Sequence, residues 1–478
     1  LNVGDQNTET NNSGEAKYTR NSYIGRINET YADKYLLTVN FRADASSVFS
    51  ASHRWAFSPS IGLGWILTDE PCLASQTLFD LLKLRASWGQ VGNDAIPPDA
   101  SQITVTPNLP YFFGGGAVGG SAITQIKDQN LGWEVSDESD LGVEFSMLNG
   151  KLTGELGYYN KLTKNALIYV LIPSTLGSQP NPNSSIPTGY VLTNAANISN
   201  IGEEASLRWN GRVNRKLTWY VGGNITFNHN NVVGLNGGQP YIDGPIGADQ
   251  PDVTRTDNGH PVGSFYVQKV LGVFQNQAQI ESYTDSHGNM LQPGAVPGDF
   301  KYQFNNNGKL DSVYAGSYQP VAYYGISAGI TYGPLDLTID TYGNFGNSVY
   351  NGKKAFRQSF QDNVEASTAQ NSWTNSNHTN TEPRANPGNL PASTYFVESG
   401  SFFRINNLTL GYTISPATLE RTKVISSLRV YFTSENPLTF KKYSGFTPEL
   451  PGPPTAAGIE LNAYPTVRTF ALGVNVGF

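Results

Sequence analysis

The sequence predicts an all-β protein, namely a transmembrane antiparallel β-barrel with long extracellular loops and short periplasmic turns. Apolar and polar residues alternate along most of the chain, which places them on opposite faces of a strand. The alternating stretches run for about ten residues, the length of a membrane-spanning strand, whereas strands usually have about five or six. Aromatic residues lie near the ends of these stretches, as in the girdles of membrane barrels: Trp55, Trp65, Trp88, Tyr332 and Tyr412.

The composition agrees with this fold class and limits the kinds of binding partner to be expected. Charged residues make up 14% of the chain, and the net charge of −7 is spread along it, so nucleic acid is not an expected partner. The single cysteine, Cys72, excludes an intramolecular disulfide and a thiolate metal cluster. The mean hydropathy of −0.34 is compatible with a barrel in a lipid bilayer, because half of each strand faces a polar lumen.

The predicted strands can be followed in order along the chain. In YLLTVNFRAD, Tyr35, Leu37, Val39 and Phe41 share one face. Similar alternation follows in WAFSPSIGLGWIL (55–67), LLKLRASW (81–88), SLRWNGRV (206–213), LTWYVGGNITF (217–227), YGISAGITYG (324–333), LDLTIDTYGNF (335–345), NNLTLGYTI (406–414), SLRVYF (427–432) and TFALGVNVGF (469–478). A soluble sandwich would alternate too. The polar faces here hold Gly, Ser, Asn and Thr with few Lys/Glu pairs, which favours the membrane barrel.

Connection lengths predict the topology, because bacterial barrels have short periplasmic turns and long external loops. Short connections are residues 32–34, 68–78, 148–151, 214–216, 333–334 and 416–423; long ones are 46–54, 90–136, 160–198, 231–322, 347–400 and 435–466. Their alternation predicts about 13 crossings and places FYVQKVLGVF (265–274) inside a long external loop. Closed bacterial barrels normally have an even number of strands. The odd count predicts that strands are missing and that the chain begins in an external loop.

Seven stretches, in order along the chain, resemble the SusC/RagA-type branch of TonB-dependent outer-membrane transporters. They are FRADASSVFSASHRWAFSPSIGLGW (41–65), LLKLRASWGQVGND (81–94), LGWEVSDESDLGVEF (131–145), GSFYVQKVLGVF (263–274), GDFKYQFNNNGKLD (298–311), SFFRINNLTLGYTIS (401–415) and GFTPEL (445–450). The resemblance implies a barrel of about 22 strands in the outer membrane of a Gram-negative bacterium. Residues 1–478 would be its C-terminal part, without the plug domain and the TonB box.

The resemblance also implies a function and partners. Such transporters act together with a SusD-type surface lipoprotein to import oligosaccharides or peptides. TonB supplies the energy for this transport by acting on the plug. The remaining N-terminal barrel and plug segment would therefore be a partner of these residues. A final strand with Phe470, Leu472, Val474, Val476 and Phe478 toward lipid resembles the signal that the barrel assembly machinery reads.

Other function classes remain as alternatives. An enzyme is not expected, because the five histidines share no motif and no catalytic triad or carboxylate pair stands out. A passive porin, a structural outer-membrane barrel or a surface binding or adhesion module would also fit the pattern of strands and loops.

Two sets of loop residues are candidate sites. Aromatic rings that could contact substrate or the capping lipoprotein are Tyr111, Phe112, Phe113, Trp133, Trp373, Tyr395 and Tyr443, with packing between loops as the alternative. A weakly calcium-like loop has Asn305, Asn307 and Gly308 where the template wants acids or amides and a glycine, with Gln303 and Tyr314 at its outer positions. Asp299 and Asp311 are its nearest carboxylates, so poor affinity and no cofactor are expected.

Charged residues on the predicted lumen face form a third set. They are expected to pair with one another or with the plug, because an unpaired buried charge is costly: Arg42, Lys83, Arg85, Glu144, Arg208, Arg212, Asp336, Asp340, Arg404 and Arg429.

Overall fold

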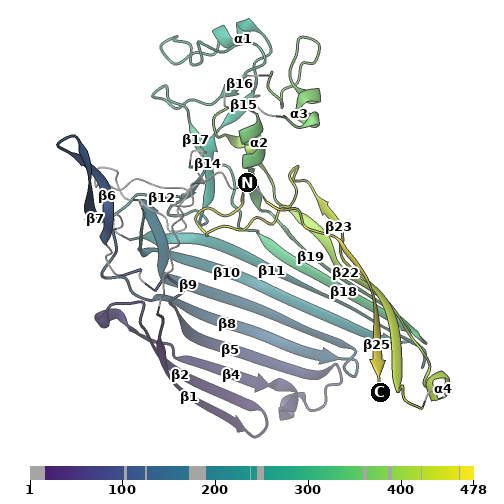
Figure 1. The fold of residues 1–478 in the computed structure, drawn as a ribbon. Coiled ribbons are helices and arrows are strands. Elements are labelled where there is room, and N and C mark those ends of the chain that lie inside the picture. Colours follow the sequence, from purple (N-terminus) through teal and green to yellow (C-terminus); the bar gives the residue numbers. More distant parts are fainter. Residues whose placement is uncertain are drawn as a thin grey trace.

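A single curved antiparallel sheet dominates the molecule (Figure 1). This computed structural model describes residues 17–98, 100–101, 105–123, 126–171, 190–236, 238–244, 252–358, 363–385, 390–420, 423–461 and 463–478. Thirteen strands follow one another in the sheet in sequence order, which confirms the predicted number of crossings. They are β1 (Arg20–Tyr31), β2 (Tyr35–Ser46), β4 (Ser60–Ile66), β5 (Phe79–Asn93), β8 (Glu134–Met147), β9 (Leu152–Leu171), β10 (Tyr190–Arg212), β11 (Leu217–Leu235), β18 (Ala322–Tyr332), β19 (Leu335–Phe345), β22 (Phe402–Thr413), β23 (Ser427–Lys441) and β25 (Thr469–Gly477). A short strand, β3 (Trp55–Phe57), also pairs with β2. The sheet is open, and β1 and β25 are its edges.

Short and long connections alternate between the two ends of the sheet, as the sequence predicts (Figure 1). The turn between β1 and β2 needs only three residues, and Ala32 and Asp33 adopt positive φ angles of 53° and 55°. The short connections at this end also hold the helix α4 (Pro416–Leu419) and the 3-10 turns Leu67–Asp69 and Pro71–Leu73. We call this the turn end of the sheet and the opposite one the loop end.

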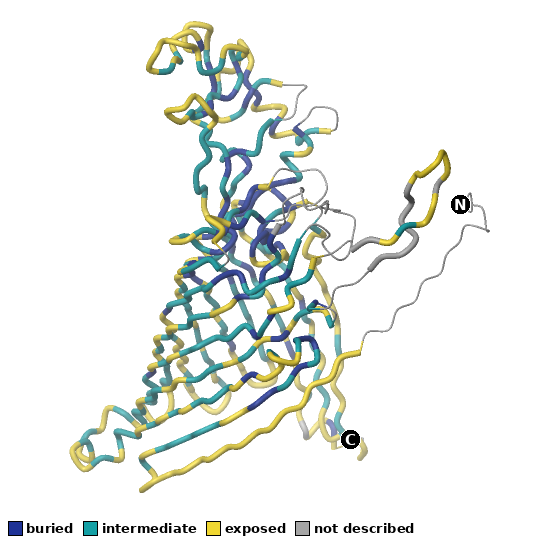
Figure 2. The backbone as a smooth tube through the Cα atoms, turned by 90° about the vertical axis from the view of Figure 1, so that its left-hand side faces the viewer, coloured by how far each residue is buried: buried dark blue, intermediate teal, exposed yellow. Residues whose placement is uncertain are grey.

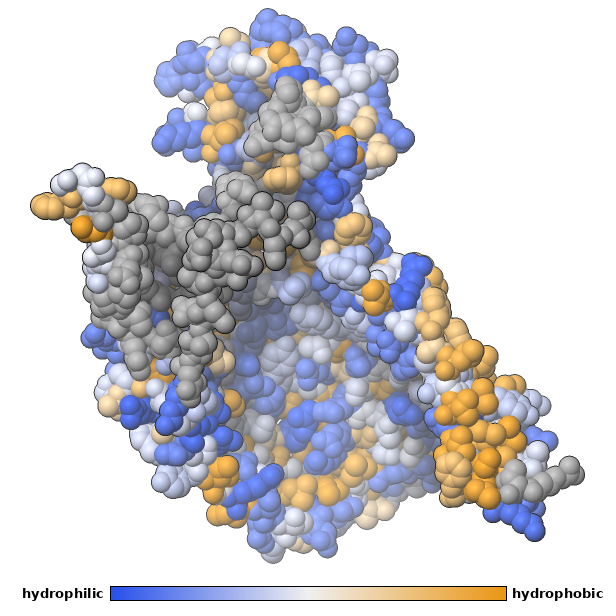
Figure 3. Space-filling view, viewed as in Figure 1, coloured by the Kyte–Doolittle hydropathy of each residue, from blue (hydrophilic) through white to orange (hydrophobic). Residues whose placement is uncertain are grey.

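The two faces of the sheet differ in chemistry because side chains alternate along every strand. On the outer face, cross-strand partners run from Leu37 to Leu63, Ala86 and Leu141, and the two middle-sheet leucines Leu63 and Leu141 are 54% and 59% exposed. The inner face carries residues such as Lys83 opposite Glu144 and Ser87 opposite Asp140. Figure 3 shows a strongly apolar strip over β23 and β25. No helix in the described residues is long and apolar enough to cross a membrane.

Several strand glycines lie directly beneath an aromatic ring of the neighbouring strand. A Cβ atom at Gly329 would overlap the ring of Tyr220, and one at Gly202 would overlap the phenol of Tyr159. On the outer face, Gly211 leaves room for Trp219 in the same way. Glycine therefore lets large rings lie flat against the wall of the sheet.

A second body of structure lies beyond the loop end (Figures 1 and 2). We call it the loop body, and it comprises the described residues of the connections 236–321, 346–401 and 442–468. Its elements are β12 (Ile242–Asp243), β13 (Thr254–Thr256), β14 (Ser264–Gln268), β15 (Val270–Val273), α1 (Gln277–Glu281), β16 (Phe300–Tyr302), β17 (Ser312–Tyr314), β20 (Ser348–Asn351), α2 (Gly352–Arg357), α3 (Ala366–Asn371), a 3-10 turn (Thr394–Phe396), β21 (Val397–Ser399) and β24 (Ile459–Glu460). The stretch 265–274 is thus extended but lies outside the main sheet, as predicted.

The loop body has its own core. Phe265, Tyr350 and Phe396 are buried together with Val253 and Val267. Figure 2 shows the buried residues gathered where the loop body meets the end of the sheet. A separate hairpin, β6 (Val105–Phe113) and β7 (Gly116–Ile123), projects from the connection between β5 and β8 (Figure 1). The 3-10 turn Ala51–His53 lies in the connection between β2 and β3.

Candidate functional site

The loop body is the candidate functional region, because three connections far apart in the sequence interlock there. The hydroxyl of Thr254 donates to the carbonyl of Thr455 at 2.8 Å in a buried position. The N–H of Tyr350 donates to the carbonyl of Gly458 at 2.9 Å, and β20 runs parallel to β24. These contacts make the three connections one folded unit at the mouth of the sheet.

Arg404 attaches this unit to the inner face of the sheet. Its side chain is 3% exposed, and its Nη1 donates to the hydroxyl of Tyr342 at 2.7 Å and to the carboxylate of Glu449. Its Nε donates to Thr439 at 2.9 Å, and the hydroxyl of Tyr342 donates to Glu449 at 2.7 Å. Glu449 belongs to the GFTPEL stretch, so this network holds the last long connection against β19 and β22.

Other predicted lumen charges also find partners on the inner face. Lys83 lies 3.2 Å from Glu144, and Arg429 lies 2.5 Å from Asp336. The remaining pairs are Arg85 with Glu144 and Glu155, Arg42 with Asp44, and the Arg208 guanidinium over the ring of Tyr220. Arg212 and Asp340 form no ion pair within the described part of the chain. Pairing among these charges is therefore largely as expected.

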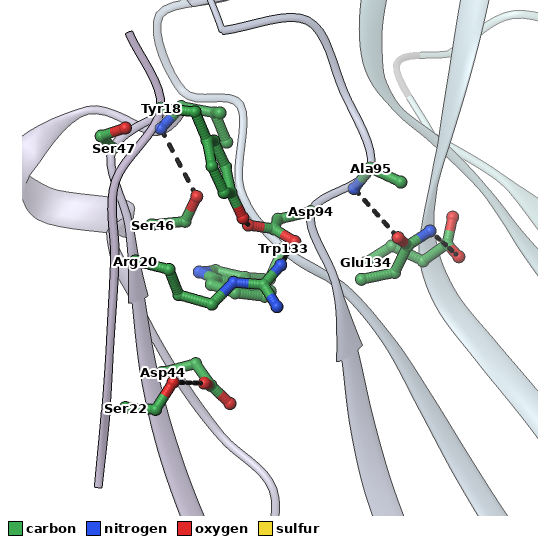
Figure 4. Close-up of polar contacts among 12 residues, drawn as sticks. Tyr18, Arg20, Ser22, Asp44, Ser46, Ser47, Asp94, Ala95, Trp133 and Glu134 are labelled. Carbon is green, nitrogen blue, oxygen red and sulfur yellow. Dashed lines mark hydrogen bonds and ion pairs between the residues drawn. The ribbon is translucent and has the colours of Figure 1, made fainter.

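Trp133, one of the predicted contact residues, is buried beneath the loop end. It is 8% exposed, its ring centre lies 5.2 Å from that of Phe49, and its Nε1 donates to the carbonyl of Arg54 at 2.9 Å. Figure 4 shows Tyr18 and Arg20 reaching toward Asp94 in the same region. The position of Trp133 agrees with packing between connections, the alternative noted above.

Trp373, Tyr395 and Tyr443 lie inside the loop body. Trp373 donates from Nε1 to Gln275 at 3.0 Å, and Tyr395 packs 4.7 Å from Phe300 in the adjoining cluster. Burial raises the pKa of the Tyr395 and Tyr443 phenols, with Glu382 and Glu460 as the second causes. Both phenols therefore stay neutral and donate hydrogen bonds to those carboxylates. Trp373 and Tyr395 share one cluster, whereas Tyr443 belongs to another.

Phe112 and Phe113 differ from the other predicted residues because they are open to solvent. Their side chains are 77% and 74% exposed near the tip of the β6–β7 hairpin, which is orange in Figure 3. The backbone of Tyr111 pairs with Val118, but its side chain lies outside the described residues. The predicted aromatic set is thus divided among the hairpin, the base of the loops and the loop body. Its role in binding stays a prediction.

The calcium-like loop already uses its oxygen atoms within the protein. The carboxylate of Asp299 accepts from Arg384 at 2.7 Å, and that of Asp311 accepts from Gln303 at 2.7 Å. The side-chain oxygen of Asn305 accepts from the N–H groups of Asn307 and Lys309 at 3.0 and 3.1 Å. The residues form an Asn/Gly turn, and weak or no calcium binding there stays a prediction.

Two contacts that hold connections in place were not predicted from the sequence. Asp94 is 6% exposed and accepts from Tyr18 at 2.8 Å and from Arg20, which secures the start of β1 (Figure 4). The second is the contact of Arg404 with Glu449. Asp94 ends the LLKLRASWGQVGND stretch and Glu449 lies in GFTPEL, so their place in these stretches was the available signal.

Comparison with known proteins identifies the family. A family model described as "TonB dependent receptor-like, beta-barrel" matches residues 2–416. The chain belongs to this family. The TonB-dependent receptor P26 of Formosa agariphila is similar to it, at 31% identity over 96% of this chain and 46% of that protein. The TonB-dependent receptor SusC of Bacteroides thetaiotaomicron is 29% identical over 96% of this chain and 44% of that protein.

A solved structure that is similar to this chain has the same fold. The structure of the RagAB peptide transporter gives a TM-score of 0.78 at 23% identity, over 96% of this chain and 47% of that chain. The chain therefore spans about half the length of the relatives that it matches. The predicted fold class and the resemblance to the SusC/RagA-type branch are both confirmed.

Proposed function

We propose that these residues form the C-terminal barrel part of a TonB-dependent importer in the outer membrane of a Gram-negative bacterium. The observation that carries this proposal is the main sheet, whose thirteen sequential strands are apolar on the outer face and polar on the inner face. That arrangement suits a wall between lipid and an aqueous lumen. The turn end then faces the periplasm, and the loop body faces the outside of the cell.

The open edges of the sheet support a further part of this proposal. Within the described part of the chain, β1 and β25 each pair along one side only, and such edges cannot remain exposed in a bilayer. A remaining N-terminal segment supplies the missing strands, the plug and the contact with TonB. The barrel assembly machinery reads the outward residues of β25, from Phe470 to Val476, together with Phe478, which follows the strand.

The loop body and the hairpin are the parts that meet substrate and a SusD-type lipoprotein. Phe112 and Phe113 are the exposed candidates for the lipoprotein contact, since exposed rings are favoured at protein interfaces. The similar solved structure is that of the RagAB peptide transporter, and the nutrient transported here is an oligosaccharide or a peptide. The protein acts by binding and transport, not by covalent catalysis.

The 299–311 loop is proposed to hold no calcium, because both of its carboxylates already have protein partners. Calorimetric titration of the purified protein with calcium would reveal tight binding if this part of the proposal is wrong.

Dependence on TonB separates an importer from a passive porin or an adhesin. Uptake of an isotope-labelled peptide pool and of labelled malto-oligosaccharides is measured in cells with and without this protein, each with and without TonB. We expect the uptake that requires this protein to disappear when TonB is deleted. Uptake that requires the protein but persists without TonB would identify a porin, and unchanged uptake without the protein would contradict transport altogether.

A further inference from the structure

A polar recess of about 410 Å³ lies where the loop body joins the ends of β19 and β22. Its volume falls in the range of small-ligand pockets, about 300–1,000 Å³. Three segments form it: one from the connection before β18, one leaving β19 and one leading into β22. The polar residues that matter for its chemistry are Lys269, Asn347, Ser348, Thr394, Glu398 and Ser401.

Asn347 is the most unusual residue of the recess. It is 3% exposed, yet neither its Oδ1 nor its Nδ2 has a hydrogen-bond partner among the residues that the structure describes. Only its backbone is engaged, because its carbonyl accepts from the N–H of Gly400 at 3.0 Å. An unmet buried amide costs about 1–3 kcal/mol, so a partner for both atoms is expected in the working protein.

Lys269 supplies an uncompensated positive charge to the same recess. It is half-buried and forms no ion pair within the described ranges. Glu398 also lines the recess, but its carboxylate accepts from Asn351 and from the backbone and side chain of Ser444 at 2.8–2.9 Å. Among the described residues, the wall of the recess therefore holds a buried amide without a side-chain partner and a cation without an ion-pair partner.

Two strands that are sheet edges within the described residues border the recess. β17 is the last strand of the sheet β12–β13–β14–β17, and β21 is an edge of the sheet β21–β20–β24. The backbone N–H of Lys269 donates to the carbonyl of Asp311, and the backbone N–H of Ala315 donates to the carbonyl of Phe265. Because an antiparallel ladder alternates, the backbone groups of Ser312 and Tyr314 point away from β14. Such an edge can pair with an added extended chain.

We propose that this recess binds an extended peptide end, with its backbone read by Asn347 and the β17 edge and its terminal carboxylate held by Lys269. The ring of Tyr314, which also lines the recess, is partly covered by two other rings and so is a poor platform for a sugar. The ring of His260 stacks on the Tyr314 ring with their centres 3.5 Å apart, and the centre of the Tyr266 ring lies 5.0 Å from that of Tyr314. A peptide is therefore favoured over an oligosaccharide. The inference rests on the proposed importer function in one respect, namely that such peptides reach the loop body.

The test measures binding to the purified protein in detergent. Three samples are passed separately over immobilised protein: a pool of random tetrapeptides without Asp or Glu, the same pool with amidated C-termini, and maltotetraose. Mass spectrometry then measures the amount of each sample that is retained. We expect retention of the free-acid pool only. Lys269→Met should lower this retention at least about tenfold, as loss of a charged hydrogen bond does. The matched control is Lys309→Met, because Lys309 is an exposed lysine of the nearby turn and should leave retention unchanged.

Asn347→Leu keeps the side-chain volume and should also reduce retention of the free-acid pool. The comparison of free-acid and amidated pools on the unaltered protein needs no variant, so a folding defect in either variant leaves the proposal testable. Three results would overturn the proposal: equal retention of both pools, retention of maltotetraose alone, or no retention of any sample. The last result would mean that water satisfies the Asn347 amide. None of these results would affect TonB-dependent uptake in cells, which tests the importer proposal separately.

Discussion

Arg404→Met is expected to release the last long connection from the wall of the sheet and to destabilise the protein by about 3 kcal/mol. The methionine keeps much of the side-chain volume but removes every hydrogen bond to Tyr342, Thr439 and Glu449. Breaking a buried ion pair on one side costs about 3–5 kcal/mol, and the lower end applies because Glu449 is 36% exposed. Urea unfolding in lipid vesicles measures the loss. Limited proteolysis should show new cleavage between residues 442 and 468.

Arg42→Met is the matched control for this substitution. Arg42 also lies on the inner face and contacts a carboxylate, that of Asp44 at 2.6 Å, but its side chain is 45% exposed. An exposed ion pair contributes about 0–1 kcal/mol. This variant should therefore unfold at nearly the same urea concentration as the unaltered protein and should resist the protease. Equal destabilisation by the two variants would show that Arg404 does not anchor the connection.

Gly329→Val is expected to prevent most of the protein from reaching the folded barrel. Its side chain would overlap the ring of Tyr220, which lies flat on the wall and carries the Arg208 guanidinium 4.0 Å from its centre. Overpacking costs about 1–3 kcal/mol, and the rigid ladder on both sides of β18 leaves little room for relief. The folded fraction can be measured in outer-membrane extracts by heat-modifiable gel mobility.

Two further variants test the stated cause of that defect. Gly62→Val also adds a branched side chain to a strand that is paired on both sides, but the nearest neighbour of its Cβ is the Cβ of Ser87 at 3.9 Å, so folding should be nearly normal. Combining Gly329→Val with Tyr220→Ala should recover part of the folded fraction. If Gly62→Val were as harmful as Gly329→Val, or if the second substitution gave no recovery, the ring would not be the cause.

The architecture of the wall was predictable because its physical signal is local. Every strand has two different environments, so residues such as Leu63 and Gly64 reveal their faces through a period of two. Tight turns such as that at Ala32 and Asp33 are short stretches between such strands. The number of sequential strands in the main sheet, apart from the short β3, and the exclusion of residues 265–274 from that sheet followed from these two signals.

The loop body was not predictable in the same way. Its contacts join residues far apart in the sequence, such as Thr254 with Thr455 and Arg404 with Glu449, and no periodic pattern indicates which connection packs on which. An aromatic residue in a loop suits a core as well as a binding surface. Trp133 and Tyr443 are buried and Phe112 is exposed for reasons of tertiary packing alone.

Cysteine labelling tests the central claim, the orientation of the sheet in the outer membrane, most directly. Cys72 is exposed in the 3-10 turn Pro71–Leu73 at the turn end, whereas Asn307 is exposed in the loop body. A membrane-impermeant maleimide is applied to intact cells and to cells with a permeabilised outer membrane. Cys72 should react only after permeabilisation, and Asn307→Cys in a Cys72→Ser background should react in intact cells. Labelling of Cys72 in intact cells, with Asn307→Cys protected, would contradict the orientation of the whole barrel.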